Sequence, residues 1–213
     1  MAEARIFVTR HLAEDDPWRR ALAADGYAVT AYSLLRFAPV PAGPLPPGDW
    51  VFAYSRNAVR YGLPSLAAAK TRPRVAAIGP GTAAAWREAG YEVAFEGAGD
   101  PRDVAEAFGR AAGPGARVVF LQAANSRRSV ERVLGDRIRA VAHIVYRSEI
   151  DPGRRAPPTQ VMLLTSPLNA AAALRNLAPS RAPKLLAIGP TTEKWCRDRG
   201  YDVERWQPPR RAA

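Results

Sequence analysis

Short apolar runs alternate with amphipathic segments along most of this chain. Runs such as Ile6 to Thr9 and Trp50 to Tyr54 are rich in β-branched or aromatic residues, which is typical of buried strands. Between them lie helix signals, for example Asp16-Pro17 as a helix start and Gly26 as a helix end. Strands and helices that alternate in this way predict parallel sheets with helices on both faces.

The same pattern places further elements in the first hundred residues. Apolar runs predict strands at residues 27–34, 75–78 and 91–95, and amphipathic stretches predict helices at residues 18–26, 57–69 and 82–89. Residues 39–48 are rich in proline, which lacks a backbone N–H and excludes both a helix and a central strand there.

The chain contains an internal duplication with an offset of 110 to 112 residues. The matching pairs of segments are 75–95 with 185–205, 50–59 with 161–171, and 4–10 with 116–122. Residues 4–99 and 116–209 are therefore two copies of one unit. Each copy supplies about five strands, which predicts two small doubly wound lobes that together form one cleft.

The repeated loops follow strands, where open α/β sheets bind their ligands. Gly79-Pro80-Gly81-Thr82 and Gly189-Pro190-Thr191-Thr192 each join a strand to a helix, so that free helix amides and a Thr hydroxyl could hold an anion. A helix start with a capping Thr would leave the same pattern, and this alternative stays open. Ser55 and Ser166 end the preceding strands, and helix capping alone could also explain them.

The composition is that of an ordinary globular protein. With 213 residues, 47% of them hydrophobic and 24% charged, the chain can bury a core of its own. One cysteine, Cys196, and two histidines, His11 and His143, are too few for a typical zinc or iron–sulfur site, so no metal is expected. The phosphate-binding patterns Gly-x-x-x-x-Gly-Lys and Gly-x-Gly-x-x-Gly are missing, which argues against a nucleotide cofactor.

Nothing in the sequence directs the chain to a membrane or out of the cell. Residues 1–10 enter a strand-like run without the apolar core of a secretion signal. The uncharged stretch 156–174 is interrupted by prolines and amides, so it is not expected to span a bilayer. We expect a cytoplasmic protein.

The net charge of +11 could indicate a protein that binds nucleic acid. The basic residues are dispersed, however, and no segment forms a basic tail or stripe. Only three of the 31 basic residues are lysines. Two interpretations remain: a basic surface exposed to solvent, or a basic cleft in which arginines bind a substrate with many carboxylates.

Four patterns follow one another along the chain: Val-Thr-Arg at 8–10, Trp-Val-x-x-x-Ser-x-Asn-Ala-Val at 50–59, Ala-Ile-Gly-Pro-x-Thr at 77–82 and 187–192, and Val-Tyr-Arg-Ser at 145–148. Their order and spacing resemble the uroporphyrinogen-III synthase family, and the resemblance covers residues from about 5 to 206. Two places depart from the family. Tyr54-Ser55 replaces a usual Thr-Ser, and residues 122–126 replace a loop rich in Arg and Gly.

The resemblance implies two similar flavodoxin-like lobes, each a doubly wound parallel sheet, that exchange halves of the chain. Residues 1–36 plus 150–213 would form one lobe, and residues 37–146 the other. A two-strand hinge would join them near residues 36–38 and 146–149.

The resemblance also implies the reaction. The family closes hydroxymethylbilane, a linear tetrapyrrole with eight carboxylates, to uroporphyrinogen III, with inversion of the last pyrrole ring and loss of water. It needs no cofactor. Tyr146 would be the catalytic residue that donates a proton to the leaving hydroxyl, unless this aromatic ring only packs near the hinge. The residues implied in substrate binding are Ser55, Asn57, Gly79, Thr82, Ser166, Asn169, Gly189, Thr191 and Thr192.

Two other classes of function remain open at this point. A two-lobe α/β protein could bind a tetrapyrrole or another small ligand without chemistry. A nucleic-acid-binding protein is disfavoured by the dispersed charge. We expect a monomer whose partner is the small-molecule substrate, with no nucleic acid and no membrane.

Overall fold

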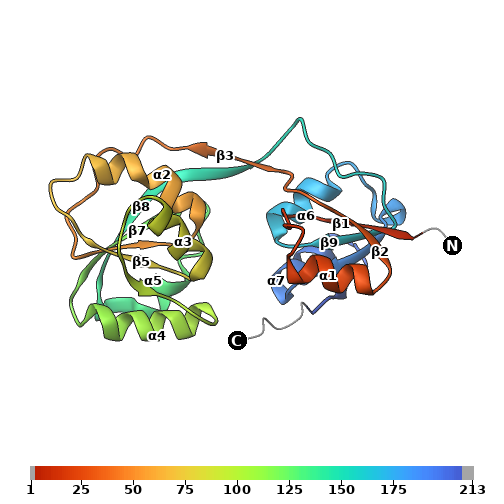
Figure 1. The fold of residues 1–213 in the computed structure, drawn as a ribbon. Helices are drawn as coiled ribbons and strands as arrows, with labels where there is room; N and C mark the ends of the chain where they lie inside the picture. Colours follow the sequence, from red (N-terminus) through yellow and green to blue (C-terminus); the bar gives the residue numbers. More distant parts are fainter. Residues whose placement is uncertain (1–2, 208–213) are drawn as a thin grey trace. The chain divides into compact units, whose positions relative to one another are not determined.

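The computed structural model describes residues 3–207, which divide into two compact units. Unit 1 contains the described residues up to Arg36 and those from Glu149 onward. Unit 2 contains Phe37–Ser148. Each unit is built around its own sheet (Figure 1).

Unit 1 is a five-stranded sheet with helices on both faces. Its strand order is β11-β10-β9-β1-β2, and all of its neighbours are parallel. Helices α6 and α7 cover one face, where Phe7 and Met162 are buried, and α1 covers the other, where Ile6 and Leu163 are buried. The elements are β1 (Ala4–Val8), α1 (Pro17–Ala24), β2 (Tyr27–Ala31), β9 (Val161–Leu164), α6 (Pro167–Leu174), β10 (Lys184–Ala187), α7 (Pro190–Arg197) and β11 (Glu204–Arg205).

Unit 2 is a six-stranded sheet in the order β3-β8-β7-β4-β5-β6. Helices α2 and α3 cover one face, and α4 and α5 cover the other (Figure 1). Trp86 packs in the first core, and Phe52, Phe108 and Phe120 pack in the second. The elements are β3 (Leu35–Pro39), β4 (Trp50–Ala53), α2 (Arg56–Ala67), β5 (Arg74–Ala77), α3 (Pro80–Glu88), β6 (Val93–Glu96), α4 (Pro101–Ala112), β7 (Arg117–Ala123), α5 (Ser129–Leu134) and β8 (Arg139–Ile150).

The two sheets have the same topology, built from exchanged halves of the two sequence copies. In unit 1, β1 and β2 of the first copy pair with β9, β10 and β11 of the second. In unit 2, β7 and β8 of the second copy pair with β4, β5 and β6 of the first. If the five strands of each sequence copy are numbered along the chain, the equivalent strands of both sheets lie in the flavodoxin-like order 2-1-3-4-5. The chain passes between the units within β3 and β8, which neighbour each other in the sheet of unit 2. The predicted fold class is confirmed.

Several predicted element boundaries are wrong. The strand expected at 27–34 ends at Ala31, and the next strand, β3, begins at Leu35, because the Ser33 hydroxyl accepts the Leu35 amide in a tight turn between β2 and β3. The helix expected to begin at residue 82 begins at Pro80, whose fixed φ suits the first helical turn. The last strand of the first copy is Val93–Glu96 rather than 91–95. Unit 2 has six strands rather than about five because β3 joins its edge.

A register shift between β7 and β8 changes which side chains share a face of the sheet. Strict alternation would place His143 and Tyr146 on opposite faces of the sheet. A β-bulge between Gln122 and Ala123 breaks that alternation, so that Leu121 pairs with His143 and Ala123 pairs with Tyr146. Leu121 and Ala123 belong to the core under α2 and α3. His143 and Tyr146 therefore lie on that same face.

Candidate functional site

In unit 1, a network of hydroxyl groups joins the carboxyl ends of β1 and β9, where the strand order reverses. The Thr9 and Thr165 hydroxyls lie 3.1 Å apart, and the Thr165 amide donates to the Thr9 hydroxyl at 3.0 Å. Ser166 caps α6 by accepting the Asn169 amide at 3.2 Å. The Asn169 side-chain amide donates to both Thr165 and Ser166, at 3.2 and 3.0 Å. The network holds Ser166 and Asn169 in place at this switch point, the usual ligand position in such sheets.

Asn169 has one atom that the protein leaves unused. Its Oδ1 is buried and has no hydrogen-bond partner among the described residues. A buried acceptor without a partner costs about 1–3 kcal/mol. A donor on a bound ligand or a water molecule would recover that cost.

The Gly-Pro loops begin their helices without a side-chain cap. Gly79 is the N-cap of α3 and Gly189 the N-cap of α7, and neither helix has a side-chain cap hydrogen bond. Thr82 and Thr192 are buried inside the first turn, and their hydroxyls accept no cap hydrogen bond. The alternative of a capping Thr is thus wrong for both copies. Gly189 and the exposed Thr191 lie at the carboxyl end of β10, and Gly79 at that of β5.

In unit 2, Tyr146 and Ser55 are in direct contact. Their hydroxyl groups lie 3.0 Å apart, and the Ser55 hydroxyl also accepts the Ala58 amide at 3.0 Å as the cap of α2. The Tyr146 ring stacks on Tyr61, with 5.5 Å between ring centroids, and meets Phe37 edge-on at 6.0 Å. This packing leaves Tyr146 only 7% exposed. Burial raises the pKa of Tyr146, against a smaller lowering by the Ser55 hydrogen bond, so the phenol carries its proton at neutral pH.

Asn57 is a further predicted site residue of unit 2. It lies in the first turn of α2, half-buried, and lines a surface pocket between α2 and α3 with Arg56 and Arg60. It does not join the Ser55–Tyr146 pair by any hydrogen bond found in residues 3–207.

A cluster at the switch point of unit 2 was missed from the sequence. The Tyr54 hydroxyl accepts the backbone amides of Val130 and Glu131 at 3.0 and 3.3 Å and donates to the Glu131 carboxylate at 3.4 Å. Burial raises the pKa of Tyr54 to about 12 and also raises the pKa of Glu131. Gln122 is 1% exposed, and its side-chain oxygen and nitrogen are both buried without a hydrogen-bond partner among the described residues.

The internal duplication could have indicated this cluster from the sequence alone. Tyr54 occupies the position of Thr165 in the other copy, and both side chains use a hydroxyl at a switch point. The two copies therefore use different partners at this position: Thr165 contacts Thr9, just after the neighbouring strand β1, whereas Tyr54 reaches the start of α5.

We expect Tyr54→Phe to destabilise the protein by about 1–3 kcal/mol, because it removes the acceptor of two backbone amides and leaves the ring in place. Urea unfolding measures the change in the free energy of unfolding. Tyr91→Phe is the matched control, since the Tyr91 ring packs on Trp86 and its hydroxyl has no hydrogen bond within the described part of the chain. Equal stability of the two variants would contradict the anchoring role of Tyr54.

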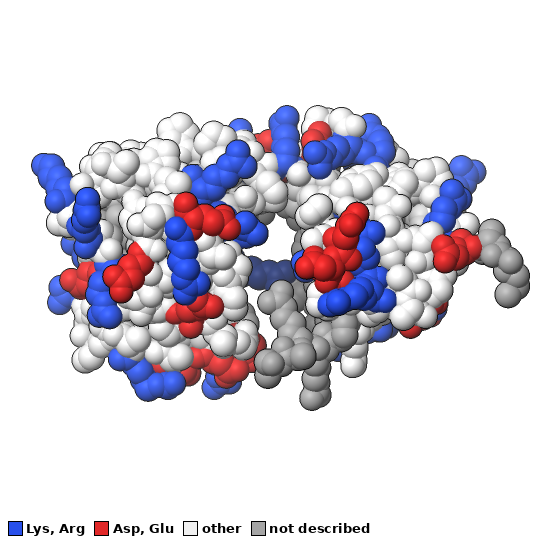
Figure 2. Space-filling view, viewed as in Figure 1, with Lys and Arg blue, Asp and Glu red and all other residues white. Residues whose placement is uncertain are grey.

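Charged residues of both signs are mixed on the face of the molecule shown in Figure 2. Many arginines pair with acids, for example Arg137 with Glu106 and Arg87 with Glu96. Within residues 3–207, no group of His, Cys, Asp and Glu residues could hold a metal ion, and no helix there is long and apolar enough to cross a membrane.

A family model described as Uroporphyrinogen-III synthase HemD matches residues 16–210. The chain belongs to the uroporphyrinogen-III synthase family. It is therefore an enzyme, a lyase of porphyrin and haem biosynthesis that forms uroporphyrinogen III from hydroxymethylbilane, a tetrapyrrole substrate. The alternative of a non-catalytic binding protein finds no support in these comparisons.

Two solved structures share the fold of this uroporphyrinogen-III synthase family member. Uroporphyrinogen-III synthetase from Helicobacter pylori matches with a TM-score of 0.65 and 16% identity, covering 97% of this chain and 94% of that one. A mutant uroporphyrinogen III synthase from the extremely thermophilic bacterium Thermus thermophilus matches with a TM-score of 0.53 and 16% identity, covering 98% and 94%. No curated protein matches this chain.

Proposed function

We propose that the polar residues at the carboxyl ends of β4, β5, β9 and β10 bind the carboxylates of hydroxymethylbilane, and that Tyr146 protonates its leaving hydroxyl. The observation that carries the proposal is the Tyr146–Ser55 pair at the end of β4, in a family that must expel a hydroxyl group. Turnover of hydroxymethylbilane by the purified protein, with the product isomers resolved, tests it.

The reaction needs little chemical assistance from the protein, because the substrate is itself reactive. Electrons of the terminal pyrrole ring break the bond between carbon and the hydroxyl oxygen, which leaves as water after taking a proton. The resulting azafulvene is attacked by the substituted carbon of the last ring, and the spiro intermediate then fragments and closes again with that ring inverted. The overall reaction removes a hydroxyl from one end of the chain and a hydrogen from the other. The substrate also closes by itself without inversion, so holding it in the geometry of spiro closure is the main contribution of the protein.

The hydrogen bonds around Tyr146 suit a proton donor. The Ala58 amide donates to Ser55, which leaves the Ser55 hydroxyl hydrogen free to donate to the Tyr146 oxygen. The Tyr146 hydrogen is then available to a leaving hydroxyl. The ring is held by Tyr61 and Phe37, so the phenol needs no reorganisation before it donates. The hydrogen that leaves the substrate carbon at the end of the reaction restores the Tyr146 proton.

The helix starts supply the features that an anion needs. Gly79 and Gly189 begin α3 and α7 without a side-chain oxygen over the first amides. Exposed helix amides carry partial positive charge and attract carboxylates. Ser55, Thr82, Ser166, Thr191 and Thr192 add hydroxyl groups, and Asn57 and Asn169 add side-chain amides, in the two repeated settings.

We expect Thr192→Val to weaken tetrapyrrole binding by about 1–2 kcal/mol, the contribution of one hydrogen bond to a charged group. Valine keeps the shape of this buried side chain and removes only its hydroxyl. Titration with uroporphyrin III measures the affinity. Thr71→Val, at an exposed loop position, is the control. If the folded Thr192→Val variant binds as tightly as the control, Thr192 has only a packing role.

The proposal also covers the partners, the location and the oligomeric state of the enzyme. The enzyme acts without a nucleic-acid partner, as a cytoplasmic monomer with a small-molecule substrate and no added cofactor. The dispersal of Lys and Arg along the sequence supports the first of these points, and on the face shown in Figure 2 they are interspersed with acidic residues.

A further inference from the structure

Unit 1 contains a pocket at the opposite ends of the strands from its candidate site residues. Its volume is about 480 Å³. Thr159 and Pro183 line it just before the amino ends of β9 and β10, whereas Ser166 and Gly189 follow the carboxyl ends of the same strands. The loop 155–159, the end of α6 and the segment 181–183 complete the wall. None of the candidate site residues lines this pocket.

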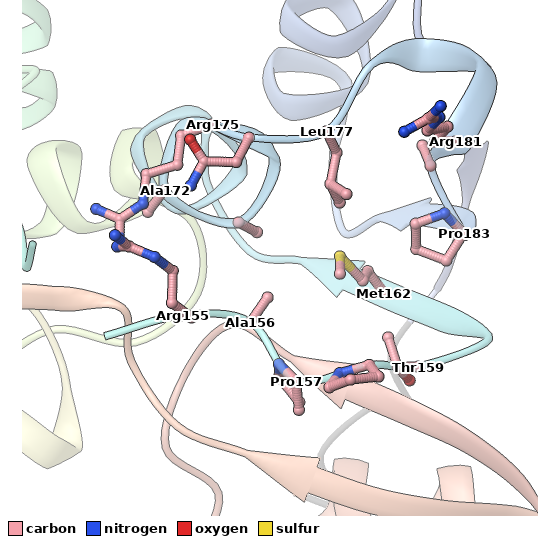
Figure 3. Close-up of a pocket in the computed structure, with 14 residues that line it drawn as sticks. Arg155, Ala156, Pro157, Thr159, Met162, Ala172, Arg175, Leu177, Arg181 and Pro183 are labelled. Atoms are coloured by element: carbon pink, nitrogen blue, oxygen red, sulfur yellow. The ribbon is translucent and has the colours of Figure 1, made fainter. Parts of the chain in front are cut away.

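The floor of the pocket is apolar. Met162, 3% exposed, lies at the centre of the pocket, with Leu177 above it and Pro157 below it in the view of Figure 3. Ala156, Ala172 and Ala182 complete this surface with small side chains that leave the space open. A concave apolar surface with a few polar groups is the usual form of a small-molecule site.

Three arginines line the same pocket, and no acidic residue does. Arg155 and Arg175 both donate to the Arg154 carbonyl, so their guanidinium groups lie together at one end. Arg181 lies at the other end (Figure 3). The nearby acid, Asp151, is already paired with Arg154, at 3.4 Å, and its side chain accepts the Gly153 amide.

The cationic groups of the pocket have capacity left for a ligand. The Arg155 guanidinium donates only to the carbonyls of Pro152 and Arg154 in the described structure, at 2.7 and 3.3 Å. The Arg181 side chain has no acceptor among residues 3–207. The Arg175 Nε is buried there without a partner. Guanidinium groups that meet only carbonyls favour a carboxylate, which they can bind through two parallel hydrogen bonds.

We propose that this pocket binds an amphipathic anion, a carboxylate carried on a compact aromatic body, at a second site of the enzyme. The apolar body would lie on Met162 and Leu177, and the carboxylate would lie at an arginine end of the pocket. The polyanionic substrate of the family has carboxylates around all of its rings and does not fit an apolar floor. The ligand of this site is therefore a different molecule with few charges.

The methionines give this pocket a direct probe. The chain has two, and Met162 is the one in the described residues, so labelling of methionine methyl groups with carbon-13 gives a signal from the pocket floor. We expect naphthalene-2-carboxylate and biphenyl-4-carboxylate to shift the Met162 signal in a saturable way. Naphthalene-2-methanol, which has the same ring without the charge, should bind at least about tenfold more weakly.

Arginine variants decide whether the charges act as proposed. Arg155→Gln and Arg181→Gln should each weaken binding of the better acid, and the more affected of the two by about tenfold to a hundredfold. Arg72→Gln, at an exposed position of unit 2, should leave binding unchanged. Turnover of hydroxymethylbilane should be the same in all three variants, so this test is separate from that of the proposed function.

Three results would overturn the proposal. The first is no change of the Met162 signal with either acid up to millimolar concentration. The second is equal affinity for the acid and the alcohol, which would leave an apolar crevice only. The third is unchanged binding in both Arg155→Gln and Arg181→Gln, which would place the anion elsewhere.

Discussion

Replacing Tyr146 by phenylalanine should lower the turnover of hydroxymethylbilane by about tenfold to a hundredfold, at or below the lower end of the range for general acid catalysis. The change removes the hydroxyl that contacts Ser55 and keeps the ring that stacks on Tyr61. The loss stays in this lower range because the substrate ionises readily by itself. Initial rates at saturating substrate measure the effect, and the type III isomer should remain the main enzymatic product.

The pH dependence of the same enzyme gives a second readout. Burial raises the pKa of Tyr146, so the donor stays protonated through neutral pH and is lost only in alkaline solution, above the ordinary tyrosine range near pH 10. The wild-type rate should therefore show no fall from Tyr146 between about pH 7 and 9. Tyr61→Phe is the matched control, because it keeps the stacked ring next to Tyr146 and removes a hydroxyl that donates to the Phe37 carbonyl. Full turnover in a folded Tyr146→Phe variant would remove Tyr146 from the mechanism.

Separating the two sequence copies should abolish folding altogether. Residues 1–110 contain β1 and β2 without their partner β9, and β4 without its partner β7. Residues 111–213 contain the missing partners and lack the strands they pair with. Each half therefore exposes two incomplete sheets, and we expect both halves to be unfolded or aggregated when expressed alone. Circular dichroism and urea unfolding would show no cooperative transition.

Residues 37–148 make the matched control fragment, because they contain all the helices and nearly all the sheet of unit 2. We expect this fragment to unfold cooperatively. The predicted lobe boundaries, residues 1–36 with 150–213 and residues 37–146, stay a prediction that this comparison tests. Stable, cooperative halves together with an unfolded 37–148 fragment would contradict the exchange of halves as a folding unit.

The elements and their order could be predicted because the signals for them are local. Pro17 begins a helix, and Ser55 and Ser166 cap the helices that follow their strands, as short-range patterns indicate. The exchange of halves came from the family resemblance, since the duplication alone is equally compatible with two separate lobes. Pairing between β1 and β9 joins residues about 155 positions apart, and no local pattern reports it.

The parts of the site that could not be predicted depend on packing. The β-bulge at Ala123 moves Tyr146 onto the face of His143, against the alternation of a regular strand. Glu131 reaches Tyr54 because α5 packs beside the end of β4, and its sequence position alone gives no sign of this contact. The pocket at Met162 is assembled from three separate segments whose arginines look like ordinary surface residues in the sequence.

The isomer composition formed from hydroxymethylbilane tests the central claim most directly. The purified protein is mixed with freshly made substrate, the products are oxidised to porphyrins, and the type I and type III isomers are separated and quantified against a sample without protein. We expect rapid formation of a product that is almost entirely type III, whereas the sample without protein gives type I. A product that is type I at the spontaneous rate, from folded protein, would contradict the assignment of synthase activity.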